Sequence, residues 1–279
     1  MLSSAPTPQV IDLGRLPYAD AYALQVAHNE EVLAARASGS PDPGRILLVE
    51  HDPPVITISR RPGAAAHLIA SPDTLGRAGV TIAQTDRGGD ITYHGPGQLV
   101  VYPILDLNLY RLRLHDYMRL LEAAVIDTLA DFDIRAQRDV CATGVWVPEC
   151  RHQGIEATRH PDRPSDADGS SLSMPQCLNP SMPSSKICAM GVRIRRWVSL
   201  HGLALNVTTN LDHFDLIVPC GLAGRTVTSM LQILGARCPS MPAVKHALVE
   251  SLRRHLTGAH SSTKTTPPAL EPAVHEDQF

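Results

Sequence analysis

The chain has 279 residues, 43% of them hydrophobic, and a formal net charge of −3 at pH 7. This length allows one large domain or two small ones, and the weak charge argues against broad surfaces for nucleic acid or membranes. The opening MLSSAPTPQV lacks the basic and apolar segments of a secretory signal, and no apolar run is long enough to span a membrane. We therefore expect a cytoplasmic protein with reduced thiols. The six cysteines are Cys141, Cys150, Cys177, Cys188, Cys220 and Cys238.

Helical and strand patterns alternate along the chain. A helix is expected over 19–37, and a second one around 117–129, where apolar residues recur at i, i+3 and i+4. Strands rich in apolar residues follow one another in the middle of the chain, and this pattern predicts an α/β or α+β fold on a mixed sheet. The expected strands cover 45–50, 55–59, 99–104, 143–147, 186–194 and 198–207, and a last helix covers 243–256.

Two stretches lack this periodicity. Residues 148–185 are rich in proline and polar residues and read as a long, mobile insertion between two strands. Residues 258–279 are rich in Ser, Thr, Pro, Ala and Glu, as is typical of a disordered tail. We therefore expect one catalytic domain over 1–257 that contains the insertion.

The segment RGGDITYHGPGQLVVYPI, residues 87–104, is the strongest local signal of a site. Gly88 and Gly89 have no side chains, so a ligand or a second backbone can approach them closely. The glycines are not followed by Gly-Lys-Ser/Thr and do not open a helix, which disfavours phosphate-binding and dinucleotide-binding loops. A hairpin without a ligand is the alternative interpretation.

Cys220 is the candidate nucleophile because it stands in the turn-forming sequence Ile-Val-Pro-Cys-Gly. Pro219 favours an extended approach to the thiol, and Gly221 leaves a backbone N–H free to stabilise an oxyanion. Local sequence alone leaves a second reading open, in which Cys220 is a buried cysteine that packs as a small hydrophobe.

Lys186 is the candidate proton carrier, because it opens an apolar strand in a chain that holds 22 Arg and only three Lys. An amine can release its proton whereas a guanidinium cannot. A surface lysine at a strand start is the alternative. His94 and His201 are candidates for a base or an orienting hydrogen bond, and His201 is expected to be a satisfied core residue.

A structural metal is not expected. The spacings of the cysteines and histidines match neither Cys-x-x-Cys nor His-x-x-x-His ligand patterns.

Four motifs in order resemble the lipoyl(octanoyl) transferases of lipoate biosynthesis. They are RGGDITYHGPGQLVVYPILDL, GVWV, KICAMGVRIRRWVSLHGLALNV and IVPCGLAGRTVTSM, and the likeness runs from about Leu16 to Leu234. The resemblance implies the biotin/lipoate protein ligase-like α/β fold in a single domain. Cys188 departs from the pattern, since the family has a small residue two positions after its catalytic lysine.

The resemblance also implies the site. Cys220 falls on the family's acyl-thioester nucleophile and Lys186 on its acid/base partner. The substrate-binding segments fall on Arg87, Gly88, Gly89, Asp90, Ile91, Thr92, Tyr93 and His94, on Ala189, Met190 and Gly191, and on Gly202, Leu203 and Ala204.

The implied activity is transfer of an octanoyl group from octanoyl-acyl carrier protein to a lysine of lipoyl domains, in 2-oxoacid dehydrogenase complexes and the glycine cleavage H protein. No cofactor, metal, nucleic acid or membrane is implied, and a monomer is expected. Two alternatives stay open: an ATP-dependent lipoate- or biotin-protein ligase, and a non-catalytic protein that binds acyl groups or lipoyl domains.

Overall fold

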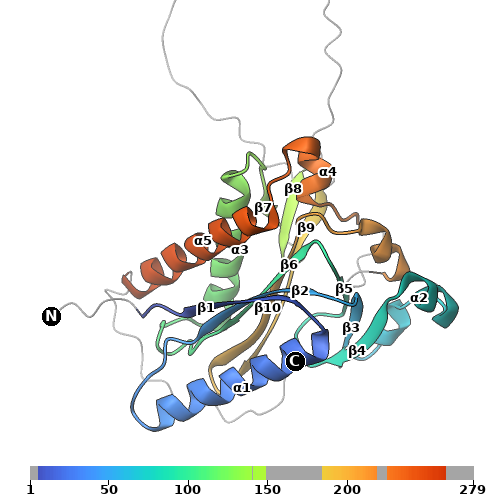
Figure 1. The fold of residues 1–279 in the computed structure, drawn as a ribbon. Coiled ribbons are helices and arrows are strands. Elements are labelled where there is room, and N and C mark those ends of the chain that lie inside the picture. Colours follow the sequence, from blue (N-terminus) through green and yellow to red (C-terminus); the bar gives the residue numbers. More distant parts are fainter. Residues whose placement is uncertain (1–5, 140, 149–183, 219–224, 262–279) are drawn as a thin grey trace, which may run out of the picture.

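The computed structural model describes residues 6–139, 141–148, 184–218 and 225–261, and within these it shows two β-sheets with helices packed around them (Figure 1). The α-helices are α1 (Tyr18–Ala37), α2 (Pro72–Ala78), α3 (Leu114–Ala130), α4 (Met230–Leu234) and α5 (Met241–Ser261). Short 3₁₀ helices are η1 (Ala64–His67), η2 (Leu211–Leu216) and η4 (Gly235–Arg237).

The larger sheet has seven strands in the order β1-β2-β6-β10-β9-β8-β7. Only β1 and β2 pair in parallel within it, so the sheet is mixed. Its strands are β1 (Gln9–Leu16), β2 (Arg45–His51), β6 (Gln98–Ile104), β7 (Gln137–Arg138), β8 (Val145–Pro148), β9 (Ser184–Arg195) and β10 (Val198–Asn206).

The smaller sheet has three strands in the order β4-β3-β5, which are β3 (Val55–Ser59), β4 (Thr81–Thr85) and β5 (Ile91–His94). It lies beside the larger sheet (Figure 1). Its own core contains residues from α2 and η2.

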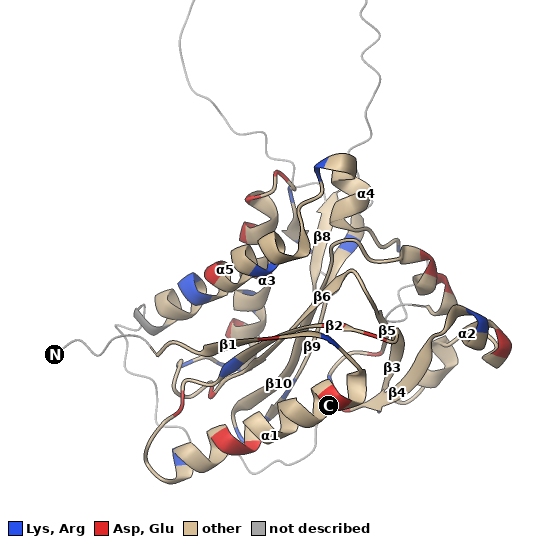
Figure 2. Ribbon diagram, viewed as in Figure 1, with Lys and Arg blue, Asp and Glu red and all other residues tan. Residues whose placement is uncertain are grey.

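Side-chain alternation along the central strands gives the large sheet two buried faces. Leu99 and Val101 of β6 pack under α3 and α5, whereas Val100 and Tyr102 pack under α1. The strands β6 and β10 are buried along their whole length and carry no Lys, Arg, Asp or Glu (Figure 2). Helices on both faces explain why these strands read as apolar without alternation.

The helix predicted over 19–37 is confirmed as α1, and the strand and helix predictions along the chain are confirmed with shifts of a few residues at their ends. The prediction missed the strands β1, β4, β5 and β7 and the helices α2 and α4. Both β1 and β4 are sheet edges with many exposed positions, so their apolar pattern is weak.

The helix α5 continues to Ser261, so the predicted tail was wrong in starting at residue 258. The remainder of that tail, 262–279, and residues 149–183 of the predicted insertion lie outside the described residues.

Two glycines let the sheets touch. Gly88, in the loop between β4 and β5, donates its N–H to the carbonyl of Val192 in β9 at 3.0 Å. A Cβ on Gly191 would stand 2.6 Å from the Gly88 oxygen, which is closer than Cβ atoms approach other atoms in proteins. The sequence predicted close approach at Gly88, and the partner is the backbone of β9.

Gly191→Ala is therefore expected to force the loop away from β9 and to lower the free energy of unfolding by about 1–3 kcal/mol. Gly76→Ala is the matched control, because a Cβ at this helical position meets no atom within 4 Å. Urea denaturation measures both variants. Equal stability of the two variants would contradict the contact.

Candidate active site

A pocket lies on the α1 side of the large sheet, and its empty space, including open solvent at its mouth, is about 480 Å³. It is bounded by β9, β10, the β4–β5 loop, β5, β6 and the start of α1. Its lining residues are Tyr18, Arg87, Gly89, Thr92, His94, Val100, Tyr102, Ala189, Met190, Gly191, His201, Gly202, Leu203 and Ala204. We call it the acyl pocket, because ten of these residues are among those that the resemblance predicts to bind the substrate.

Alternation along β5 divides the predicted residues of this strand between two environments. Thr92 and His94 line the acyl pocket, whereas Ile91 and Tyr93 pack into the core of the small sheet. Asp90 is buried and its Oδ2 lies 2.9 Å from Nδ1 of His67. Gly88, Asp90, Ile91 and Tyr93 are thus the predicted binding residues that do not line the pocket.

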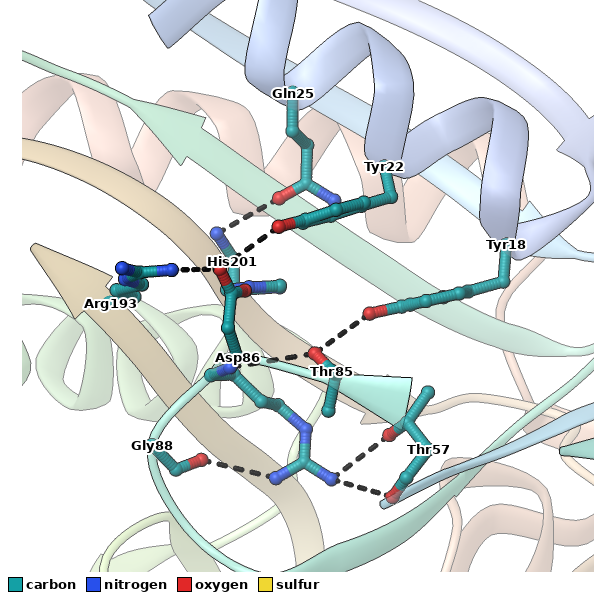
Figure 3. Close-up of polar contacts among 10 residues, drawn as sticks. Tyr18, Tyr22, Gln25, Thr57, Thr85, Asp86, Gly88, Arg193 and His201 are labelled. Atoms are coloured by element: carbon teal, nitrogen blue, oxygen red, sulfur yellow. Dashed lines mark hydrogen bonds and ion pairs between the residues drawn. The ribbon is translucent and has the colours of Figure 1, made fainter. Parts of the chain in front are cut away.

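Arg87 ties the β4–β5 loop to the small sheet. Its Nη2 donates to the carbonyl and the hydroxyl of Thr57 at 3.0 and 2.9 Å, and its Nη1 donates to the Gly88 carbonyl (Figure 3). These bonds fix the course of the loop beside the pocket.

His94 lines the pocket, and the buried ring of His51 packs against it with the ring centroids 5.6 Å apart. His51 Nδ1 lies 3.2 Å from the Leu16 carbonyl, and its Nε2 lies 2.7 Å from the hydroxyl of Tyr102. This pairing suits a neutral ring that donates from Nδ1 and accepts at Nε2. Burial lowers the pKa of His51 to about 4 and holds the pKa of His94 well below its usual value.

His201 lies at the other end of the lining. Its ring is 3% exposed, and its Nε2 is 2.7 Å from Oδ1 of Asp86 (Figure 3). The prediction that His201 is a buried, hydrogen-bonded residue is confirmed, and the residue also lines the pocket. Burial lowers its pKa, against the opposing effect of the Asp86 carboxylate.

A second pocket, of about 300 Å³, adjoins the first and contains Lys186. The two pockets share Thr92, Ala189 and Ala204 as lining residues, so together they follow β9 and β10. The remaining residues of the second pocket are Gln98, Asn206, Phe214 and Val227.

Lys186 is held at its side chain and at its backbone. Its Nζ lies 4.7 Å from the centre of the Trp146 ring, an arrangement in which the indole face attracts a cation. Among the described residues, no carboxylate lies within ion-pair distance of this Nζ. The backbone of Lys186 pairs with Thr226 and Thr228, through bonds of 2.9 Å each.

The predicted nucleophile Cys220 lies outside the described residues, as do Cys150 and Cys177. Cys188, the thiol near Lys186 in sequence, is fully buried, and burial raises its pKa to about 12. The sequence interpretation missed Tyr18, Val100 and Tyr102 as lining residues. No local signal marks Val100 and Tyr102, because pocket-facing positions of a doubly buried strand look like its other apolar positions. Tyr18 reaches the pocket from the start of α1, which is far from β6 in the sequence.

The model of the lipoyl protein ligase A/B catalytic domain matches residues 21–253. The chain belongs to this family. It is 43% identical over 225 residues to an octanoyltransferase of Solibacter usitatus, covering 81% of this chain and 82% of that one. It is 38% identical over 226 residues to an octanoyltransferase of Parabacteroides distasonis, covering 80% and 87%. The predicted family and the predicted acyltransferase activity, an octanoyl transfer in lipoylation, are confirmed.

Solved structures of lipoate ligases share the fold. A bi-partite lipoate protein ligase from Thermoplasma acidophilum superposes with a TM-score of 0.59 at 16% identity, covering 90% of this chain and 84% of that one. A lipoate-protein ligase A bound with ATP superposes with a TM-score of 0.56 at 17% sequence identity, covering 90% of this chain and 85% of that one. The predicted ligase-like α/β fold is therefore confirmed. At these identities the likeness carries the fold alone.

Two features of the described ranges concern membrane spanning and metal binding. None of the helices found there is both long and apolar enough to traverse a bilayer. In the same residues, no three His, Cys, Asp or Glu side chains come together as ligands for a metal ion.

The buried histidines of this family member predict a loss of stability in acid. His51, His94 and His201 have lowered pKa values when folded, whereas the unfolded chain takes up these protons near pH 6.5. The unfolded state therefore binds more protons below pH 6.5, and the free energy of unfolding falls as pH falls toward 4. His51 alone contributes about 1.4 kcal/mol per pH unit in this window.

Urea denaturation at pH steps from 7 to 4 measures this slope. His51→Gln should make the slope shallower, and His115→Gln, at an exposed histidine, should leave it unchanged. If His51→Gln leaves the slope unchanged, the lowered pKa of His51 is not a cause of the lost stability in acid.

Proposed function

We propose that this protein takes the octanoyl group from octanoyl-acyl carrier protein and transfers it to the lysine of lipoyl domains, through a thioester on Cys220. The single observation that carries the proposal is the run of two adjoining pockets from Lys186 to His201 along β9 and β10. The acceptors are the lipoyl domains of 2-oxoacid dehydrogenase complexes and the glycine cleavage H protein.

The dimensions of the acyl pocket suit an eight-carbon chain. Ala204, where the two pockets meet, is three positions from His201 along β10, which corresponds to about 10 Å along a strand. With C–C bonds of about 1.5 Å, an extended octanoyl chain spans about 9 Å from its carbonyl carbon to its methyl end. Val100 and Ala204 line the pocket and belong to the core on the α1 side, so they provide apolar contact for the chain.

The anchoring of the chain around 219–224 supports Cys220 as the nucleophile. Before this segment, Val218 donates its N–H to the His67 carbonyl at 2.8 Å. After it, Thr226 and Thr228 bond to the backbone of Lys186. The segment that carries Cys220 thus begins and ends at fixed points, and the second point is Lys186 itself.

The proposed chemistry needs a group that both gives and takes a proton. The Cys220 thiolate attacks the thioester carbonyl, and the carrier thiolate leaves. The Lys186 ammonium protonates that thiolate and becomes a neutral amine. A neutral acceptor lysine then attacks the acyl-enzyme, transfers its proton to Lys186 and releases the Cys220 thiolate.

The surroundings of Lys186 favour this role. Lys186 is 8% exposed and its amine rests against an indole instead of a carboxylate, so its proton is not held by a fixed anion. Cys188 does not compete as a nucleophile, because burial raises its pKa to about 12 and the thiol stays protonated.

Transfer without ATP tests the proposed function. Purified protein, octanoyl-acyl carrier protein and an isolated lipoyl domain should yield a lipoyl domain heavier by one octanoyl group. Transfer only from free octanoate with ATP would identify a ligase. Binding of the lipoyl domain without transfer would identify a non-catalytic protein.

Lys186→Arg should lower the rate of transfer by about 10²–10⁴-fold, nearly as much as Lys186→Ala, because a guanidinium stays charged and cannot shuttle the proton. Lys245→Arg is the control, since Lys245 forms an ion pair with Asp12 outside both pockets. Near-normal turnover in the Lys186→Arg variant would exclude the proton-transfer role.

A further inference from the structure

The backbone of His201 departs from the strand that carries it. Its φ is +59°, in the left-handed region, whereas the neighbouring positions of β10 continue the strand. Leu200 and Ala204 face α1, so regular alternation would direct residue 201 toward the opposite face, with Leu203. The ring nevertheless meets Asp86 and the α1 residue Tyr22 on the α1 side.

This conformation is strained for a residue with a side chain, and the surroundings hold it in place. The His201 N–H donates to Oε1 of Gln25 at 2.9 Å (Figure 3). The Tyr22 ring stacks on the imidazole, with centroids 5.6 Å apart and planes 13° from parallel. The ring of His201 therefore has one fixed position in the acyl pocket.

Asp86 is the centre of this arrangement. Its carboxylate accepts from His201, from the Tyr22 hydroxyl at 2.9 Å, and from the Arg193 guanidinium (Figure 3). Burial raises the pKa of Asp86, but the hydrogen bonds from His201 and Tyr22 hold it well below its usual value, so the carboxylate stays charged. Its side chain is 7% exposed and that of Arg193 is 38% exposed, so the arginine lies on the solvent side.

His201 and Lys186 belong to opposite ends of the pockets. Along β10, Asn206 lines the Lys186 pocket, Ala204 lines both pockets, and His201 is the last lining residue of the acyl pocket. On β9, the same order runs from Lys186 through Ala189 to Gly191. A chain whose carbonyl lies beside Lys186 therefore directs its methyl end toward His201.

We propose that His201, fixed by Asp86 and Tyr22, closes the far end of the acyl pocket and sets the length of the acyl chain that the enzyme accepts. This inference rests on the proposed function, because it takes the acyl chain to lie in this pocket. His201 is the specificity-determining residue, and Asp86, Tyr22 and Gln25 are positioning residues that act through it. Chains longer than octanoyl then meet the imidazole ring.

The test compares kcat/KM for saturated acyl-pantetheine thioesters of 6, 8, 10, 12 and 14 carbons, with a lipoyl domain as acceptor. These small donors remove any contribution from docking of a carrier protein. For the wild type, each methylene beyond the pocket end should lower kcat/KM by about tenfold or more. His201→Gly removes the ring and accepts a positive φ without strain, so the ratio of 12-carbon to 8-carbon kcat/KM should rise at least tenfold.

Two further variants distinguish a steric limit on acyl-chain length at His201 from a general loss of activity. Asp86→Asn keeps the shape of the side chain but weakens its hold on the ring, and should shift the profile in the same direction by less. Arg195→Ala is the control at the end of β9, because Arg195 contacts Glu30 at 4.0 Å and does not line the pocket. Its profile should equal that of the wild type.

The outcomes are distinct. An unchanged chain-length profile in folded His201→Gly, or a wild type that accepts 8 to 14 carbons equally, overturns the inference and leaves the proposed function intact. If His201→Gly does not fold, an unchanged profile in Asp86→Asn overturns the inference instead. Absence of octanoyl transfer by the wild type, from both the small thioester and octanoyl-acyl carrier protein, would overturn the proposed function itself.

Discussion

The antiparallel pairing of β9 with β10 is the constraint on which the site depends. The ladder runs from Val198 paired with Arg195 to Leu205 paired with Cys188. It fixes the distance between Lys186, near one end of β9, and His201, on the facing strand. It also places 189–191 opposite 202–204, so that two separate sequence motifs form one wall.

The second sheet completes the pocket because two backbones can meet without side chains between them. The contact of Gly88 with β9 at Gly191 and Val192 brings the β4–β5 loop against the ladder. Arg87 then fixes that loop to β3, and β5 presents Thr92 and His94 to the pocket. Of the two glycines of the RGG motif, Gly88 thus serves packing between the sheets and Gly89 lines the pocket.

Much of this arrangement could be predicted from the sequence. The apolar runs and the 3.6-residue periodicity predicted β6, β10, α1 and α3, because burial on the large sheet imposes those patterns. The four ordered motifs identified the family, and the resemblance predicted most of the residues that line the acyl pocket. The edge strands β1 and β4 were missed, because half-exposed edges need few apolar residues.

The role of His201 could not be read from the sequence for a different reason. A histidine in an apolar strand predicts burial, and it is buried. The face of the sheet on which its ring lies, however, depends on its backbone conformation and on contacts with Gln25, Tyr22 and Asp86. These three residues are more than a hundred positions away in the chain. Such long-range determinants leave no local pattern. The same holds for Tyr18, which reaches the pocket from the start of α1.

The fold is shared with ligases that are unlike this chain in sequence, so the chemistry must be tested at the proposed nucleophile. The most direct measurement is intact-protein mass spectrometry after incubation with octanoyl-acyl carrier protein in the absence of an acceptor. We predict a gain of one octanoyl group on the wild type and on Cys188→Ser, and none on Cys220→Ser. An adduct that persists in Cys220→Ser, or transfer by the wild type through no covalent adduct, would contradict the account.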